Sequence, residues 1–75
     1  PEDEVIRVIE ELLRIAAEVD EVHRRNVEVQ EEASRVTDRE RLERLNRESE
    51  ELIKRSRELI EEQRKLIERL ERLAT

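Results

Sequence analysis

The stretch LERLNRESEELIKRSRELIEEQRKLIERLERL, residues 42–73, decides the fold of this chain. When it is numbered as a heptad repeat abcdefg with Leu42 at a, leucine fills every d position and isoleucine most e positions. These residues are Leu45, Leu52, Leu59, Leu66 and Leu73 at d, and Ile53, Ile60 and Ile67 at e. A repeat of about 3.5 residues places a, d and e on one face of an α-helix, so the pattern predicts a helix whose apolar face packs against other helices.

The first half of the chain carries a second apolar stripe in a register of its own. With Val5 at a, the d column is β-branched throughout, and apolar residues at e and b widen the stripe. The members are Val5, Leu12 and Val19 at a; Val8, Ile15, Val22, Val29 and Val36 at d; Ile9 at e; and Ile6, Leu13 and Val27 at b. An arc this broad exceeds the seam of a two-stranded coiled coil, and it predicts a helix with more than one neighbour.

The two registers do not join into one straight helix. Extending the first register puts Glu40, Glu43 and Arg44 on its apolar face, so a break is expected near residues 34–38. Thr37 and Glu40 have the spacing of a capping box, with Asp38 in the first turn. We therefore predict an all-α fold, with one helix over about 2–35, a turn over about 35–38 and a second helix over about 38–74. A short turn makes this an antiparallel hairpin on the order of 50 Å long.

Composition limits the classes of function. The chain has 75 residues, 51% of them charged, with no Gly, Cys, Met or aromatic residue and one His. Disulfides and thiolate metal sites are excluded, and so is a glycine-rich phosphate loop. A chain of this size buries too little surface to be comfortably stable alone, which favours a partner.

Charge is unevenly distributed along the chain. Residues 1–36 hold eleven acidic and five basic side chains, whereas residues 37–75 hold eleven of each. An acidic first helix argues against binding nucleic acid or an anionic membrane. We expect a soluble chain, with no natural compartment, that is produced in the cytoplasm of an expression host.

Polar side chains interrupt the apolar stripes at core positions of the heptads. Because a buried amide, hydroxyl or imidazole is costly unless it is hydrogen-bonded, several of them in register predict selectivity for a partner. Ser49 and Ser56 alone could instead bond to their own helix. The candidate network residues are His23, Asn26, Gln30, Asn46, Ser49, Ser56 and Gln63.

The antiparallel hairpin predicts which of these polar residues meet. Asn26 is expected level with Ser49, and Gln30 level with Asn46, in a polar cluster near the turn that His23 borders. Gln63 is expected level with Leu12 and Ser56 with Val19. A buried glutamine that faces only aliphatic groups is unsatisfied, so its partner should come from another chain.

Catalysis and metal binding have little support in the sequence. Asp20 and His23 have the spacing of a carboxylate–histidine ligand pair, but the facing stretch offers Ser49, Leu52 and Ile53 and no carboxylate. Straight helices also provide no free backbone amides for an oxyanion hole. We expect no enzyme activity, no catalytic or metal-binding residue, no cofactor and no small-molecule substrate.

The leucine column Leu45–Leu73, the β-branched column Val8–Val36, the polar insertions at a and e, and the Glu/Arg surface together resemble de novo designed helical hairpins. Hairpins of that family pair into four-helix bundles through buried hydrogen-bond networks, and the resemblance covers the whole chain. It implies a designed protein-interaction module, in many cases one half of a heterodimer.

The expected partner is a second helical hairpin. We favour a heterodimer, because a homodimer repeats the acidic helix on both copies. A homodimer, a monomeric hairpin and a natural coiled-coil fragment are the alternatives. The predicted apolar interface consists of Val5, Val8, Ile9, Leu12, Ile15, Val19, Val22, Leu45, Leu52, Ile53, Leu59, Ile60, Leu66, Ile67 and Leu70.

Overall fold

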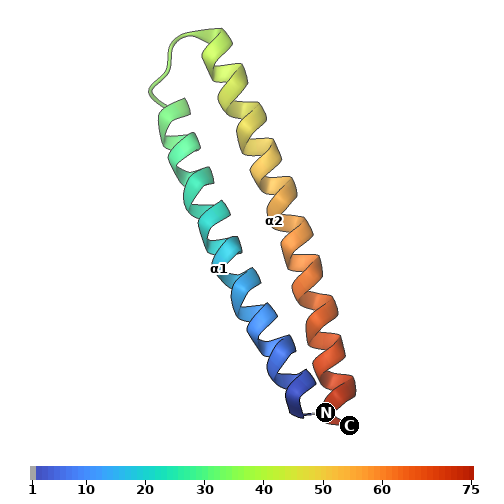
Figure 1. Ribbon diagram of the computed structural model, residues 1–75. Helices are drawn as coiled ribbons and strands as arrows, with labels where there is room; N and C mark the ends of the chain where they lie inside the picture. The colour runs from blue at the N-terminus through green and yellow to red at the C-terminus, as the bar shows by residue number, and fades with distance from the viewer. Residues whose placement is uncertain (1) are drawn as a thin grey trace.

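The computed structural model describes residues 2–75 and shows two long helices packed side by side as a hairpin (Figure 1). Helix α1 spans Glu2–Ala33 and α2 spans Arg39–Ala74. The hairpin extends 56 Å along its long axis, and the start of α1 and the end of α2 lie together, opposite the loop (Figure 1). The predictions of an all-α class and of two helices packed against each other are confirmed.

Local sequence explains why both segments are helical. Neither helix contains Gly or Pro, the residues that most disfavour a helix interior, and most surface positions carry Glu, Arg or Lys. Glu2, Asp3 and Glu4 in the first turn of α1 and Arg72 in the last turn of α2 have the charges that the helix dipole favours.

The backbone carbonyl groups at the C-terminal end of α1 find hydrogen-bond donors without a glycine in the loop. The backbone NH of Ser34 donates to the carbonyl of Gln30 at 3.0 Å, and the Ser34 hydroxyl donates to the carbonyl of Glu31 at 2.7 Å. No residue in the described range has a positive φ. A loop that needs no left-handed residue has no need of glycine, which is how a glycine-free chain makes this connection.

The cap of α2 differs from the expected capping box. Asp38, and not Thr37, is the N-cap: its φ and ψ are −74° and 119°, and its carboxylate accepts from the backbone NH of Glu40 at 3.2 Å. The backbone NH of Leu42 donates to the carbonyl of Asp38 at 3.0 Å, which places the start of the helix one residue later than the Thr37 box requires. Aspartate is at least as good an N-cap as threonine, so the adjacent residue takes this position.

The core of the hairpin consists of the d residues of both helices, which meet in one line between α1 and α2. The buried side chains are Val8, Ile15 and Val29 on α1 and Leu45 and Leu59 on α2, all at position d. Val22, Leu52 and Leu66 in the same columns are half-buried. Two helices can shield only one line of side chains between them, so the rest of each apolar arc is left outside this core.

Candidate protein-docking face

Exposure rises in order across the heptad columns on both helices. The d residues form the core, the a residues are half-buried, and the large apolar e residues are exposed. Ile9, Ile53, Ile60 and Ile67 at e keep between 38% and 53% of their surface. On an isolated hairpin these columns form an apolar face directed away from the contact between α1 and α2.

The opposite edge of the contact is closed by ion pairs between residues at position g. Arg25 Nη2 lies 2.8 Å from Glu48 Oε1, and Arg55 Nη2 lies 2.9 Å from Glu18 Oε1. Two further pairs, Arg69–Glu4 and Arg41–Glu32, continue the line to both ends of the hairpin. The column fixes which way each helix is rotated, because it holds g toward the other helix and leaves e and b outside.

These cross-helix pairs were not anticipated from the sequence, although a signal was present. The g positions of the first helix read Glu4, Glu11, Glu18, Arg25 and Glu32, and those of the second read Arg69, Glu62, Arg55, Glu48 and Arg41 in the antiparallel order. Four of the five opposed positions are complementary in charge. The fifth sets Glu11 against Glu62, and the Glu11 carboxylate instead accepts hydrogen bonds from Arg14.

The ion pairs perturb the titration of their carboxylates. The hydrogen bond from Arg69, together with its charge, lowers the pKa of Glu4, and Arg14 lowers the pKa of Glu11 in the same way. The hydrogen bond that Arg55 donates to the Glu18 carboxylate raises the pKa of Arg55. All these groups are partly or largely exposed, so the pairs orient the helices more than they stabilise them.

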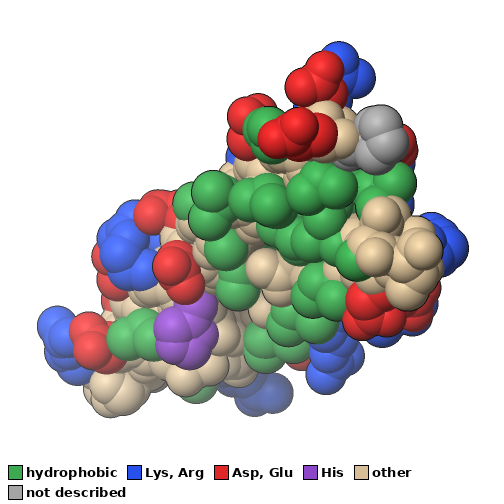
Figure 2. Space-filling view, turned by 90° about the horizontal axis from the view of Figure 1, so that it is seen from below, with side chains coloured by type: hydrophobic (Ala, Val, Ile, Leu, Met, Phe, Trp, Pro, Cys, Tyr) green, Lys and Arg blue, Asp and Glu red, His purple; other side chains and the backbone are tan. Residues whose placement is uncertain are grey.

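The exposed apolar side chains form one surface. Seen along the hairpin from the end that holds the termini, hydrophobic side chains gather in a band flanked by charged groups, with a histidine beside it (Figure 2). Leu13 is the most exposed of the large apolar residues, at 66%. A contiguous apolar patch rimmed by charge is typical of a protein-interaction site. Its large exposed members are Ile6, Ile9, Leu13, Val27, Ile53, Ile60 and Ile67.

One hydrogen bond of the expected polar network forms within the hairpin. Ser49 Oγ donates to Asn26 Oδ1 at 2.7 Å, and the two residues are half-buried at the same level of the two helices. Beside them is a groove of about 250 Å³ that runs between the helices on the apolar face. It is lined by Val22, His23, Asn26, Leu52, Ile53, Ser56 and Arg57.

The other polar candidates lie on the same face without joining that bond. His23, Gln30 and Asn46 are exposed at position e, and Ser56 and Gln63 are half-buried at position a. Among the side-chain hydrogen bonds of residues 2–75, Asn26–Ser49 is the one bond between any of the seven. The expected cluster of Asn26, Ser49, Gln30, Asn46 and His23 is thus reduced, within one chain, to a single pair. Gln30 and Asn46 lie too far toward the open side for two helices to enclose.

The predicted apolar interface residues divide into two groups. Val8, Ile15, Val22, Leu45, Leu52, Leu59 and Leu66 pack between α1 and α2 at position d. Val5, Leu12, Val19 and Leu70 are half-buried at a, and Ile9, Ile53, Ile60 and Ile67 are exposed at e. The second group belongs to the candidate docking face, which we define as the a and e columns of both helices together with the residues at b that border them.

Other chemical features of the described chain are few. Within residues 2–75 no group of three His, Asp or Glu side chains is placed to hold a metal ion. Neither α1 nor α2, over the residues described, includes a segment long and apolar enough to cross a bilayer.

Comparison with known proteins finds no matching family model, no matching curated protein and no matching solved structure.

Proposed function

We propose that this chain is a protein-interaction module, one half of a four-helix bundle whose other half is a second helical hairpin of different sequence. The carrying observation is the ordered exposure of the heptad columns: every buried residue is at d, the a residues are half-buried, and the large apolar residues at e are exposed. In a four-helix bundle each helix has two neighbours, and a and e are the positions that a second neighbour covers. Apolar burial supplies the affinity.

The polar residues of the docking face supply selectivity. The side-chain oxygen of Asn26 accepts a hydrogen bond from Ser49, and its NH₂ group remains a donor at a residue that lines the groove on the apolar face. Gln63 lies half-buried in a groove that Ile60 and Ile67 also line. A partner that brings acceptors and donors to these levels is favoured over one that brings only methyl groups, because buried polar groups without partners are costly.

A different partner is favoured over a second copy by charge. Eleven acidic and five basic residues in the first 36 positions would be present twice in a homodimer. The resemblance to designed heterodimer subunits supports the same proposal. A homodimer is the alternative outcome of the experiment below.

The test compares two variants that each add one carboxylate. Ile60→Glu places it on the docking face, and Ala17→Glu places it at an exposed position of α1 away from that face. Sedimentation equilibrium over a concentration series, with circular dichroism to follow helix content, measures self-association of the parent and both variants.

We expect the parent to form weak or mixed assemblies through the exposed face, Ile60→Glu to abolish them, and Ala17→Glu to leave them unchanged. A parent chain that stays a folded monomer up to about 1 mM contradicts a docking face. A single tight dimer of the parent contradicts the heterodimer and supports self-pairing.

A further inference from the structure

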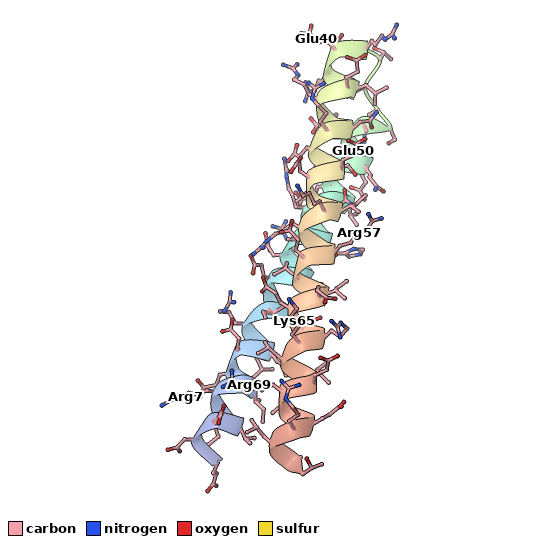
Figure 3. The ribbon with its side chains drawn as sticks, turned by 90° about the vertical axis from the view of Figure 1, so that its right-hand side faces the viewer. Arg7, Glu40, Glu50, Arg57, Lys65 and Arg69 are labelled. Carbon is pink, nitrogen blue, oxygen red and sulfur yellow. The ribbon has the colours of Figure 1, made fainter. Side chains whose placement is uncertain are left out.

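The docking face has an outer edge on each helix, at heptad position b, and the two edges differ in chemistry. The edge of α1 is aliphatic except for one carboxylate, and that of α2 is charged throughout. Figure 3 shows Glu50 and Arg57 projecting from the same side of α2, away from the side that carries Arg69. The α1 rim is Ile6, Leu13, Asp20 and Val27, and the α2 rim is Glu43, Glu50, Arg57, Arg64 and Glu71.

The ion-paired edge of the α1–α2 contact shows how side chains just outside a contact between two helices interact. At about 100° per residue, g lies about 60° from d on the outer side of the α1–α2 contact, and there Arg25 pairs with Glu48. Position b lies about 60° from e on the outer side of the open face. When a second hairpin covers e, the rim of each helix therefore meets the rim of the helix that docks against it.

We infer that the rims select the partner hairpin by its chemistry. The helix that docks along α1 presents aliphatic side chains to Ile6, Leu13 and Val27, with one cation opposite Asp20. The helix that docks along α2 is basic opposite Glu43 and Glu50, acidic opposite Arg57 and Arg64, and basic opposite Glu71. This inference rests on the proposed function, because it needs the face to be a docking site.

A second copy of this chain, docked with its loop at the same end, does not place complementary side chains opposite these rims. Asn26 and Ser49 lie at one level of the hairpin, so level positions along the two helices follow from that pair. Val27 then meets Glu50 of the second copy, and Leu13 meets Arg64 of the second copy. Ile6 meets Glu71 of the second copy, and only Asp20, opposite Arg57 of the second copy, finds a complementary group. Three aliphatic side chains against three charges make self-pairing a poor fit.

A second copy with its loop at the opposite end fails at position e. Gln30 and Asn46 lie near the loop, whereas Ile9 and Ile67 lie near the termini. Reversal sets the amides of one copy on the isoleucines of the other, where they find no hydrogen-bonding partner. Both arrangements of a homodimer are therefore disfavoured by exposed side chains of the docking face.

A probe made from this chain tests the inference. It carries Glu50→Leu, Arg64→Leu and Glu71→Leu, which give α2 an aliphatic rim for the parent's α1. It also carries Ile6→Lys, Leu13→Glu and Val27→Lys, which give α1 charges complementary to the parent's Glu71, Arg64 and Glu50. The d column and all the g ion pairs are unchanged, and against itself the probe has the same mismatches as the parent.

The matched control keeps the three leucines and reverses the three new charges, as Ile6→Glu, Leu13→Lys and Val27→Glu. Native mass spectrometry of each chain alone and of 1:1 mixtures, over a dilution series, measures the pairings. We expect the parent–probe dimer to persist at concentrations about tenfold or more below those of either homodimer, and the parent–control dimer to lose that advantage.

Equal persistence of the parent homodimer and the parent–probe dimer overturns the inference, and so does equal binding of probe and control. If no mixture associates at any concentration, the proposed function fails as well. If the chains associate through the face but probe and control bind equally well, only the inference about the rims is overturned and the proposed function stands.

Two single variants keep the test decisive if the probe does not fold. In the parent, Leu13→Glu brings a carboxylate toward Arg64 of a second copy, and Leu13→Arg brings a like charge. We expect Leu13→Glu to strengthen self-association and Leu13→Arg to weaken it. Identical effects of the two variants overturn the inference.

Discussion

The hydroxyl of Ser49 donates to the side-chain oxygen of Asn26 at 2.7 Å across the hairpin, and both side chains are half-buried. The bond lies one column outside the core of d residues, at the boundary between what two helices enclose and what they leave open. It sets Asn26 of α1 level with Ser49 of α2, and the NH₂ group of Asn26 donates no hydrogen bond within residues 2–75.

Replacing Asn26 and Gln63 together with leucine should maintain or raise the thermal stability of the assembled state. Two polar groups that are costly to bury are removed, and Ser49 can bond to its own helix. The number of oligomeric states should increase, because registers that leave amides unpaired are no longer penalised. Native mass spectrometry counts the states, and an unchanged single species contradicts the role in selectivity.

Truncation should separate the core from the docking face. Leu59 is fully buried and Leu13 is 66% exposed, so the same change to alanine has different consequences. Leu59→Ala should destabilise the hairpin by about 2–5 kcal/mol. Leu13→Ala should change the unfolding of the isolated chain little. Urea unfolding measures both, and a similar loss in the two variants contradicts the division between core and face.

Completing the column of ion pairs should stabilise the hairpin slightly. Glu62→Arg places a cation opposite Glu11, whose carboxylate lines the same hollow as that of Glu62. It also removes the negative charge that Glu62 presents to Arg14 and Arg55. We expect a rise of a few degrees at most in Tm, because exposed ion pairs contribute little. The gain should shrink in high salt. Calorimetry at low and at high salt measures it, and a gain independent of salt points to a cause other than the ion pair.

Acid should weaken the pairing of the two chain ends. Arg69 lowers the pKa of Glu4 in the folded state. The Glu4–Arg69 pair therefore stabilises the folded hairpin fully above the unfolded pKa of about 4.3, and this stabilisation is lost as pH falls through the lower folded pKa. Glu4→Gln should therefore reduce the difference in Tm between pH 7 and pH 3. Glu10→Gln, an exposed position on α1, is the control. Equal effects of the two substitutions contradict the assignment.

Much of the fold follows from local patterns in the sequence. The leucine column and the β-branched column each mark a helix, and their clash of register marks the break near residues 34–38. The exact cap did not follow: Thr37 and Asp38 are adjacent and both are good N-cap residues, so local preference does not separate them. The cross-helix position of Asn26 and Ser49 agreed with the hairpin, because an antiparallel turn leaves few ways to align two long helices.

The sequence alone did not separate the residues of the candidate docking face from those of the core. From the sequence, Ile15 and Ile53 are equally apolar and equally periodic, yet Ile15 is 1% exposed and Ile53 is 38% exposed. Their difference arises from the rotation of each helix about its own axis. That rotation is set by contacts with the other helix, including the pair Arg25–Glu48.

The sequence by itself determined two amphipathic helices, the break between them and the order of the heptad columns, because all of these depend on backbone hydrogen bonds and side-chain spacing within a few residues. Only the tertiary structure decided which columns of each arc are buried. Closing the hairpin on the d residues, with the g edge ion-paired, leaves a half-buried and the large apolar residues at e and b exposed. That choice depends on the summed packing of two segments far apart in the chain.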